Sequence, residues 1–344
     1  MNLPPIRFEP ILKHRAWGGS RLAHWGRQVQ ASDCIGESWD LADLPPEIPD
    51  GISKVAEGPL RGRTIADLRQ DFNHALLGRL PVAATGGFPL LVKLLDAESD
   101  LSVQVHPDPT YAASHPETFV KNEAWYVLEA RPGSAIYRGI RPEVTPKDFL
   151  ESLHAGHLLD CLIRIEVQAG DCVRLPSGIC HALGTGVLVA EAQTPSDTTF
   201  RVWDWDRDDP DRPLHLEPAM ACMKFGAHQD DGRPAVRKAG DIAPVEAGGV
   251  QIRRLCTTDD FTIDLGRLEG GRHVIRTTEE PTVLLGTSGE SVVTDAQGRS
   301  ARLDPGDTVL IPASCLDPVV TSATPDATEF LRIDLPATSP RALA

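Results

Sequence analysis

The 344-residue sequence lacks several features that mark whole classes of protein. It has no apolar run approaching the roughly 20 residues that a membrane-spanning helix needs. Its N-terminal residues lack the apolar core of a signal peptide, because Pro, Arg and Glu interrupt them. We therefore expect a cytoplasmic protein without a membrane partner.

The cysteines form no recognisable pattern. There are seven of them, an odd number, and no Cys-x-x-Cys occurs. Neither a disulfide framework nor a thiolate metal site is indicated. Reduced thiols in a cytoplasmic protein are the simplest interpretation.

Positive charge is also scarce. Lys and Arg number 34 against 49 Asp and Glu, which gives a net charge of −15. The electric field of such a chain repels phosphate, which argues against nucleic acid or anionic membranes as partners. An anionic substrate must therefore be bound by basic side chains gathered locally in a pocket.

Turn-forming residues are abundant, with 29 glycines and 29 prolines. They bound many short segments that are apolar or alternate between apolar and polar, which predicts a mainly β fold. The clearest predicted strands are Phe88–Leu95, Leu101–His106, Ala124–Leu128, Asp171–Leu175, Gly186–Ala190, Thr199–Trp203, Phe261–Leu265, Thr282–Leu285, Ser291–Thr294, Thr308–Ile311 and Glu329–Ile333.

Two segments have helical spacing. Apolar residues recur on one face of Thr64–Arg79, and Thr64 is a candidate N-cap. The second segment, Thr145–Leu162, opens with a Thr-Pro pair that favours a helix start. We expect it to form a short helical insertion at about residues 141–162.

A short motif occurs twice. Residues 170–176 read GDCVRLP and residues 306–312 read GDTVLIP, so each is a turn, a strand and a proline. The repeat predicts two related jelly-roll β-barrels. We place a metal-binding domain at 1–228, a linker at 229–249, and a degenerate second domain at 250–344.

A candidate metal site begins on the predicted strand Leu101–His106. Alternate side chains share a face of a strand, so Ser102, Gln104 and His106 lie together. Taken alone, such a polar face could simply contact water. The pattern Gly170-x5-Pro176-x-Gly178-x2-His181, however, resembles the second sequence motif of the cupin superfamily.

The first cupin motif normally supplies two histidines and a glutamate. The corresponding residues are Gln104, His106 and Glu123, so Gln replaces the first His. Together with His181 they offer two oxygens and two imidazole nitrogens, a set that suits one catalytic Zn²⁺ per chain. The spacing does not exclude Mn²⁺ or Fe²⁺.

Longer stretches resemble one cupin family, the type I phosphomannose isomerases, in their shorter bacterial form. Matching stretches run in order through most of residues 6–225. They are Gly36–Asp40, Phe88–Asp108 (FPLLVKLLDAESDLSVQVHPD), Lys121–Tyr126 and Leu175–Arg207.

The resemblance implies a metal-dependent aldose-ketose isomerase that interconverts mannose 6-phosphate and fructose 6-phosphate through a cis-enediol. It implies that Gln104, His106, Glu123 and His181 are zinc ligands and that Arg201 is the active-site arginine. It also implies that further residues line the same pocket, namely Lys93, Ser102, Lys121, Glu191 and Asp197.

Two departures from longer members stand out. His181 follows Glu123 by only 58 positions, which leaves no room for the large helical domain found there. Val120 stands where some members have a histidine, so a proton-shuttling histidine is not expected at that position.

Isomerisation needs cations for the phosphate and groups that stabilise charge and move a proton. Arg201, Lys93 and Lys121 are the candidate cations, with Ser102 beside them. A lysine such as Lys93 could instead extend from an edge strand into solvent. The catalytic candidates are Arg201, Lys121, Glu191 and Asp197, and the sequence does not choose the base among them.

Two other functions fit a cupin. One is another metal-dependent cupin enzyme acting on a sugar or sugar phosphate. If it were an oxygenase or an epimerase, it would share the barrel and the metal but would not need phosphate-binding cations in the pocket. The other is a non-enzymatic sugar-binding cupin, which would be expected to carry a basic DNA-binding helix that this chain lacks. We expect a small sugar phosphate as ligand, and a monomer or homodimer.

Overall fold

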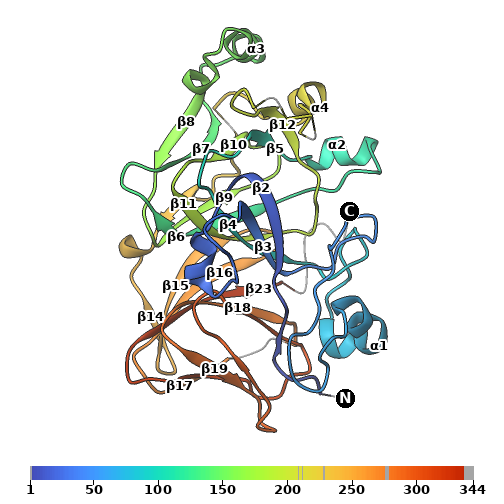
Figure 1. The fold of residues 1–344 in the computed structure, drawn as a ribbon, viewed down its shortest axis with the longest axis vertical. Coiled ribbons are helices and arrows are strands. Elements are labelled where there is room, and N and C mark those ends of the chain that lie inside the picture. Colours follow the sequence, from blue (N-terminus) through green and yellow to red (C-terminus); the bar gives the residue numbers. More distant parts are fainter. Residues whose placement is uncertain (1, 208, 211, 228, 276–278, 337–344) are drawn as a thin grey trace.

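Four β-sheets stack in layers along the long axis of the molecule (Figure 1). The computed structural model describes residues 2–207, 209–210, 212–227, 229–275 and 279–336. The sheets form two jelly-roll units, an N-terminal half and a C-terminal half, each made of two facing sheets. The predicted mainly β fold is confirmed.

The N-terminal half consists of a five-stranded and a seven-stranded sheet, which pack on each other through a shared apolar cluster. The five-stranded sheet contains, in spatial order, β12 (Phe200–Trp203), β5 (Val103–Val105), β10 (His181–Leu183), β7 (Ala135–Ile140) and β8 (Leu162–Glu166). The seven-stranded sheet contains β13 (Val236–Lys238), β9 (Asp171–Leu175), β6 (Glu123–Ala130), β11 (Val187–Gln193), β4 (Leu91–Asp96), β3 (Ile35–Leu41) and β2 (Ile11–Gly19).

The C-terminal half repeats this plan. Its larger sheet contains β1 (Ile6–Arg7), β21 (Thr308–Ile311), β18 (Thr282–Ser288), β23 (Thr328–Asp334), β16 (Thr262–Leu268), β15 (Val250–Thr257) and β14 (Val245–Ala247). Its smaller sheet contains β17 (Arg272–Val274), β22 (Val319–Ser322), β19 (Ser291–Thr294) and β20 (Ser300–Arg302).

The repeated motif occupies equivalent places in the two halves. It forms β9 in one and β21 in the other, and each strand follows a glycine with a left-handed backbone, Gly170 (φ 94°) and Gly306 (φ 91°). Residues 229–249 include β13, which pairs with β9, and β14, which pairs with β15. The domain boundaries at 228 and 250 stay a prediction.

The seven-stranded sheet of the N-terminal half is covered on both faces, which explains why β4 and β11 are nearly continuous apolar runs. Val92 and Ala190 face a core shared with the C-terminal half. Because side chains alternate along a strand, Lys93 and Glu191 point the other way, toward the interior of the N-terminal half. This sheet is therefore both the wall of the site and the junction between the halves.

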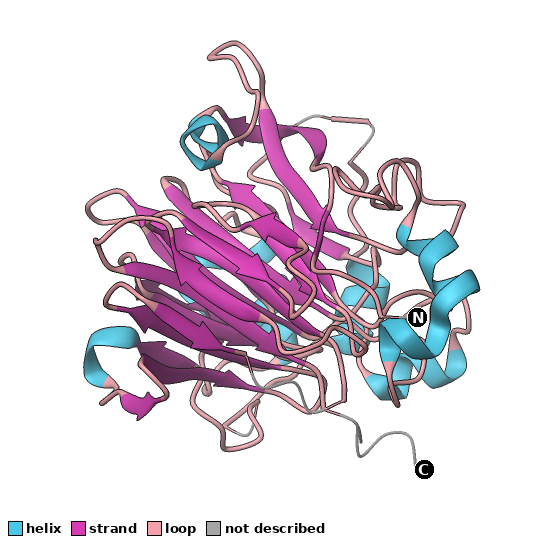
Figure 2. Cartoon of the chain, turned by 90° about the horizontal axis from the view of Figure 1, so that it is seen from below, coloured by secondary structure: helices cyan, strands magenta, loops and turns pink. Residues whose placement is uncertain are grey.

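Helices surround the sheets, as Figure 2 shows. They are α1 (Ile65–Leu77), α2 (Pro109–Ser114), α3 (Pro146–His154) and α4 (Leu216–Cys222). In the described part of the chain, none of them has the length and apolar character needed to cross a membrane.

The predicted helix starts are confirmed, since Thr64 and Thr145 each accept a hydrogen bond from the third residue of their helix. The second helix lies within the predicted insertion but ends at His154, well before Leu162. Gly156 follows with φ 76°, a conformation that stops an α-helix. Side chains of α2, α3 and α4 pack on the outer face of the five-stranded sheet, so its inner face is left for the site.

Candidate metal centre

Strand register places the site residues of the five-stranded sheet in one row. Gln104 of β5 lies opposite His181 of β10 on one side and opposite Arg201 of β12 on the other. Residues paired across neighbouring strands share a face. Three residues that are up to 97 positions apart in the sequence therefore lie side by side.

The facing seven-stranded sheet supplies a second row. Glu191 of β11 lies opposite Lys93 of β4 and opposite Trp125 of β6, and Lys93 lies opposite Trp39 of β3. Nζ of Lys93 is 3.3 Å from Oε1 of Glu191, and Nε1 of Trp125 donates to Oε2 at 2.8 Å. Lys93 is thus a buried, paired lysine and not an edge-strand lysine in solvent.

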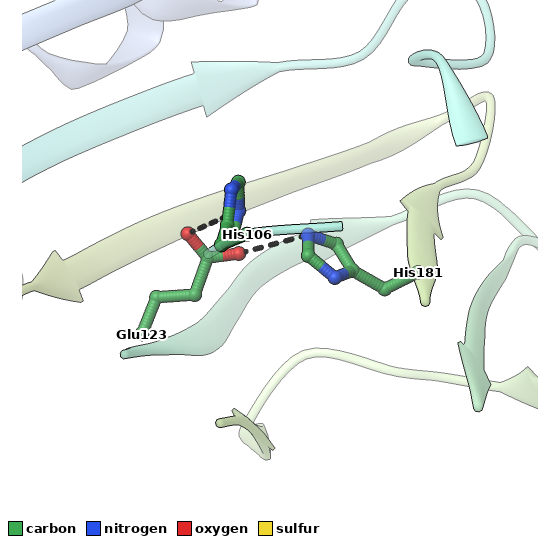
Figure 3. A group of neighbouring side chains, drawn as sticks. All are labelled: His106, Glu123 and His181. Atoms are coloured by element: carbon green, nitrogen blue, oxygen red, sulfur yellow. Dashed lines mark ion pairs between the residues drawn. The ribbon is translucent and has the colours of Figure 1, made fainter. Parts of the chain in front are cut away.

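His106 and Glu123 converge with His181 of the first row (Figure 3). The Nε2 atom of His106 lies 3.4 Å from Oε2 of Glu123, and Nε2 of His181 lies 3.1 Å from Oε1. All three residues are almost completely buried. The predicted convergence of these three side chains is observed.

Backbone carbonyl groups orient both imidazole rings. Nδ1 of His106 is 3.1 Å from the oxygen of Thr198, and Nδ1 of His181 is 2.8 Å from the oxygen of Ile179. A carbonyl oxygen only accepts hydrogen bonds, so Nδ1 carries the proton in each neutral ring. The lone pair of each Nε2 atom then points at the Glu123 carboxylate.

The protonation states of His106 and Glu123 favour a cation between the imidazole and the carboxylate. Burial, reinforced by Lys121, lowers the pKa of His106 to about 3, so this ring is neutral at neutral pH. Burial opposes ionisation of Glu123, but the ammonium group of Lys121 outweighs it and holds the pKa of the carboxyl well below its usual value. The Nε2 lone pair of His106 therefore faces a carboxylate.

Hydrogen bonding leads to the same conclusion. Within the described part of the chain, Nε2 of His106 and both carboxylate oxygens of Glu123 are buried without a hydrogen-bond partner. Lys121 forms an ion pair with Oε2 at 2.9 Å, although its approach lacks the alignment of a hydrogen bond. A divalent cation bound by nitrogen and oxygen would satisfy these atoms, so the residues present fit a metal.

Gln104 adjoins the cluster through its amide group. Its Nε2 atom is 3.3 Å from Nε2 of His181, and its Oε1 accepts a hydrogen bond of 3.2 Å from the hydroxyl of Ser102. Rotating the amide by 180° exchanges these two atoms, and the Ser102 hydroxyl can then accept from the amide nitrogen. In that orientation the oxygen faces the cluster.

A cavity of about 450 Å³ opens beside the cluster. All the predicted pocket residues line it, namely Lys93, Ser102, Gln104, Lys121, Glu191, Asp197 and Arg201. Gln104 and Lys121 belong to both the cavity wall and the surroundings of the metal cluster. A ligand in the cavity would therefore meet the metal centre at this wall.

The sequence did not point to several lining residues. Arg15, Glu37, Trp125 and Arg212 also face the cavity. Trp125 could have been found, because it follows Glu123 by two positions on one strand and so shares its face. Glu37 lies in Gly36–Asp40, one of the stretches that resemble the phosphomannose isomerases, but the resemblance gave it no role. For Arg15 and Arg212, the spacing of residues along the strands did not indicate that they face the cavity.

Glu37 links three neighbours in the cavity wall. Its carboxylate accepts from Nε of Arg15 at 2.7 Å and from Nε1 of Trp39 at 2.6 Å, and it lies 3.9 Å from Nζ of Lys93. Burial opposes its ionisation, but Lys93 and Arg15 outweigh that effect and lower the pKa of Glu37 to about 2.

Arg201 differs from the other cavity cations. Arg15, Lys93, Lys121 and Arg212 each have a carboxylate within 4 Å. Arg201, among the described residues, has no such ion pair, and its guanidinium donates to the carbonyl of Pro213 at 2.8 Å. Burial and the positive charge of Arg212 lower the pKa of Arg201. Among the described residues, no carboxylate thus neutralises the guanidinium of Arg201 by direct contact.

Fold and site together define the class of this protein as a cupin with a buried candidate metal centre. The family model for the phosphomannose isomerase type I catalytic domain matches residues 6–132. Among curated proteins, the Bacillus subtilis protein named "Probable mannose-6-phosphate isomerase GmuF" is 36% identical over 270 residues, which cover 77% of this chain and 80% of that protein. Mannose-6-phosphate isomerase ManA of the same species is 37% identical, over 65% of this chain and 69% of its own.

The likeness extends to three dimensions. A crystal structure of mannose 6-phosphate isomerase from Bacillus subtilis superposes with a TM-score of 0.83 at 27% identity, covering 97% of this chain and 100% of that one. The chain belongs to the type I phosphomannose isomerase family, whose members are metal-dependent isomerases. The predicted family and the cupin fold are confirmed.

Proposed function

We propose that this chain is an aldose-ketose isomerase that interconverts mannose 6-phosphate and fructose 6-phosphate through a cis-enediol. The observation that carries the proposal is the cavity of about 450 Å³ beside the His-Glu-His cluster, where five basic side chains gather in a protein of net charge −15. These five residues are Arg15, Lys93, Lys121, Arg201 and Arg212. Four acidic side chains, Glu37, Glu191, Asp197 and Asp209, line the same cavity, so the guanidinium of Arg201, which has no ion pair among the described residues, is the group best suited to a small phosphorylated substrate.

Zinc is the metal that we propose, with one ion per chain. Nε2 of His106, Nε2 of His181 and the Glu123 carboxylate would hold it, with the amide oxygen of Gln104 as the fourth group. Two histidines and one glutamate are a donor set of catalytic zinc sites, which can take a further ligand by expanding to five-coordinate. When bound, the ion supplies Lewis acidity toward the sugar oxygens.

Arg201 is the residue that we assign to the anionic part of the substrate. Its guanidinium lines the cavity without an ion pair among the described residues, and it can offer two parallel donors to a phosphate or an enediolate. Burial is the largest cause that lowers the pKa of Arg201, and the positive charges of Arg212 and Arg15 lower it further. These two arginines therefore add positive charge nearby. Lys93 and Ser102 complete the substrate-binding set that we propose.

Lys121 acts as a cation in this proposal. Burial disfavours its charged form, but Glu123 and Glu191 outweigh that effect, so its pKa is raised. In its charged form, the ammonium group at the cavity wall stabilises the negative charge that develops on an enediol oxygen. Lys121 is accordingly a poor choice for the proton acceptor.

The two remaining candidates for the base differ in their surroundings. Glu191 is buried and engaged by Lys93 and Trp125, which hold its carboxylate as an acceptor in the cavity wall. Asp197 lines the cavity from the loop between β11 and β12, and its own side chain is exposed. We assign proton transfer between C1 and C2 to Asp197, and the positioning of Lys93 to Glu191.

A coupled assay tests the function directly. Fructose 6-phosphate formation from mannose 6-phosphate should be measured in the purified protein, after complete chelation, and after zinc is restored. We expect activity to disappear and then return. Activity that survives metal removal, or no activity with zinc restored, would reject the proposal. The cytoplasmic location and the monomeric or dimeric state stay predictions.

A further inference from the structure

We propose that Asp260, which belongs to the C-terminal half, is a positioning residue for the metal centre of the N-terminal half. It acts through Asn122, the residue between Lys121 and Glu123. Nδ2 of Asn122 donates a hydrogen bond of 2.7 Å to Oδ2 of Asp260. This inference rests on the proposed function and extends it to the role of the second half of the chain.

Every polar atom of Asn122 takes part in a hydrogen bond. Its Oδ1 accepts from the backbone N–H of Ser177 at 2.9 Å. Its own N–H donates to Oγ1 of Thr194 at 3.1 Å, and its carbonyl accepts from the N–H of Thr194 at 3.0 Å. Because Lys121 and Glu123 flank it directly, the placement of Asn122 decides where their side chains begin.

The same amide group reaches the segments that carry the two histidines. Ser177 lies in the turn that leads into β10 and His181. In this turn the N–H of Gly178 donates to the carbonyl of His106 at 3.1 Å. One side chain, Asn122, therefore connects the backbone around Glu123 with the backbone near both imidazoles.

Asp260 is itself presented by a well-defined turn between β15 and β16. Oγ1 of Thr258 accepts from the N–H groups of Asp260 at 3.1 Å and Phe261 at 2.8 Å. Phe261 is completely buried in the core shared by the two halves. The carboxylate is consequently fixed relative to β6 by a packed core.

Loss of the Asp260 carboxylate should affect the metal more than the fold. A second cavity of about 230 Å³ is bordered by Asn122, Asp260 and also Glu123. Water in that space can take over the hydrogen bond of the amide, so folding is little affected. Water does not fix the orientation of Asn122, and partners that orient metal ligands typically contribute about 10- to 100-fold to metal affinity.

The first test uses the full-length protein and Asp260→Ala. The zinc dissociation constant is measured by competition with a chromophoric chelator, beside kcat, KM and the melting temperature. We expect zinc binding about 10- to 100-fold weaker and a comparable fall in kcat, with KM changed less than about threefold. The matched control is Asp259→Ala on the same turn, which removes an ion pair with Arg233 and should leave zinc binding within about threefold.

The second test exchanges the two side chains. The single variant Asn122→Asp places two carboxylates against each other, which breaks the hydrogen bond to Asp260. The added negative charge by itself would strengthen zinc binding, but we expect the lost positioning to outweigh it, so that zinc binding is weaker. The double variant Asn122→Asp/Asp260→Asn restores a donor-acceptor pair with the original total charge, and should regain zinc affinity to within about threefold of the original. If Asp260→Ala fails to fold, the comparison of zinc affinity between Asn122→Asp and the double variant tests the inference by itself.

The inference is overturned if Asp260→Ala binds zinc as the unchanged protein does, or if the double variant is no better than Asn122→Asp. Zinc affinity needs no substrate, so the two proposals can fail separately. A protein that shows weaker zinc binding in Asp260→Ala but never converts mannose 6-phosphate refutes only the proposed function. An active isomerase whose zinc affinity ignores Asp260 refutes only this inference.

Discussion

Nζ of Lys121 lies 2.9 Å from Oε2 of Glu123, and both side chains are buried. A lysine ammonium and a metal ion would therefore compete for one carboxylate. The proposed catalytic cation thus lies directly beside the proposed metal ligand, a position in which it disfavours metal binding while it can serve the reaction.

Replacing Lys121 should accordingly strengthen zinc binding and lower kcat. Removal of a positive charge a few ångström from a bound cation relieves about 2–4 kcal/mol of repulsion at a moderate effective dielectric constant. We expect Lys121→Gln to bind zinc at least about tenfold more tightly and to lose at least about 100-fold in kcat. Chelator competition and steady-state kinetics measure the two effects. Lys147→Gln, on the exposed surface of α3, is the control. Weaker zinc binding in Lys121→Gln would contradict the account.

Arg201 should matter for turnover and not for the metal. We expect Arg201→Ala to lower kcat by about 10²–10³-fold, the usual loss when one donor to a developing negative charge is removed. Zinc content, measured by elemental analysis, should stay at the original level. Arg201→Lys keeps the charge but not the planar pair of donors, and should recover only part of the rate. Near-normal turnover of Arg201→Ala would exclude the proposed role.

Asp197 and Glu191 can be separated by isotope exchange. In deuterated water, Asp197→Asn should slow both isomerisation and the exchange of the transferred hydrogen by about 10²–10⁴-fold, because general-base catalysis contributes that much. Glu191→Gln disturbs Lys93 and should raise KM as well as lower kcat. Nuclear magnetic resonance of the sugar protons measures both rates. If Asp197→Asn retains full exchange while Glu191→Gln loses it, the assignments must be reversed.

The stability contribution of Glu37 should depend on pH. Its folded pKa of about 2 lies below the usual value of 4.5, so its contribution is complete above pH 4.5 and falls as the pH drops toward 2. At pH 6, we expect the free energy of unfolding of the metal-free protein to exceed that of metal-free Glu37→Gln by about 3 kcal/mol. At pH 3, this difference should be smaller by about 2 kcal/mol.

Urea unfolding of both proteins at the two pH values measures this difference. Glu57→Gln, which removes a partly exposed ion pair with Arg7, serves as the control and should show only a small effect at either pH. A Glu37→Gln difference that is the same at pH 6 and pH 3 would show that Glu37 is not held ionised by its neighbours.

Strand alternation and capping could be read from the sequence because they depend on local chemistry. Ser102, Gln104 and His106 share a face through the two-residue period, and Thr64 and Thr145 cap helices through bonds to residues three positions later. The end of α3 was harder to place, because Gly156 stops the helix although apolar residues continue to Leu162.

Features that depend on long-range register could not be read this way. Arg201 lies beside Gln104, and Lys93 beside Glu191, because of how distant strands align. A one-residue slip would place these side chains on opposite faces, and no local pattern fixes that choice in advance. The hydrogen bond between Asn122 and Asp260 joins residues 138 positions apart in the sequence, and it depends further on how two sheets pack together.

The most direct test of the central claim is anomalous X-ray scattering at the zinc absorption edge, from crystals of this protein supplied with zinc. The account predicts one strong anomalous peak per chain, bounded by Nε2 of His106, Nε2 of His181 and the Glu123 carboxylate. A peak bound by other residues, or no peak among these three side chains, would contradict it.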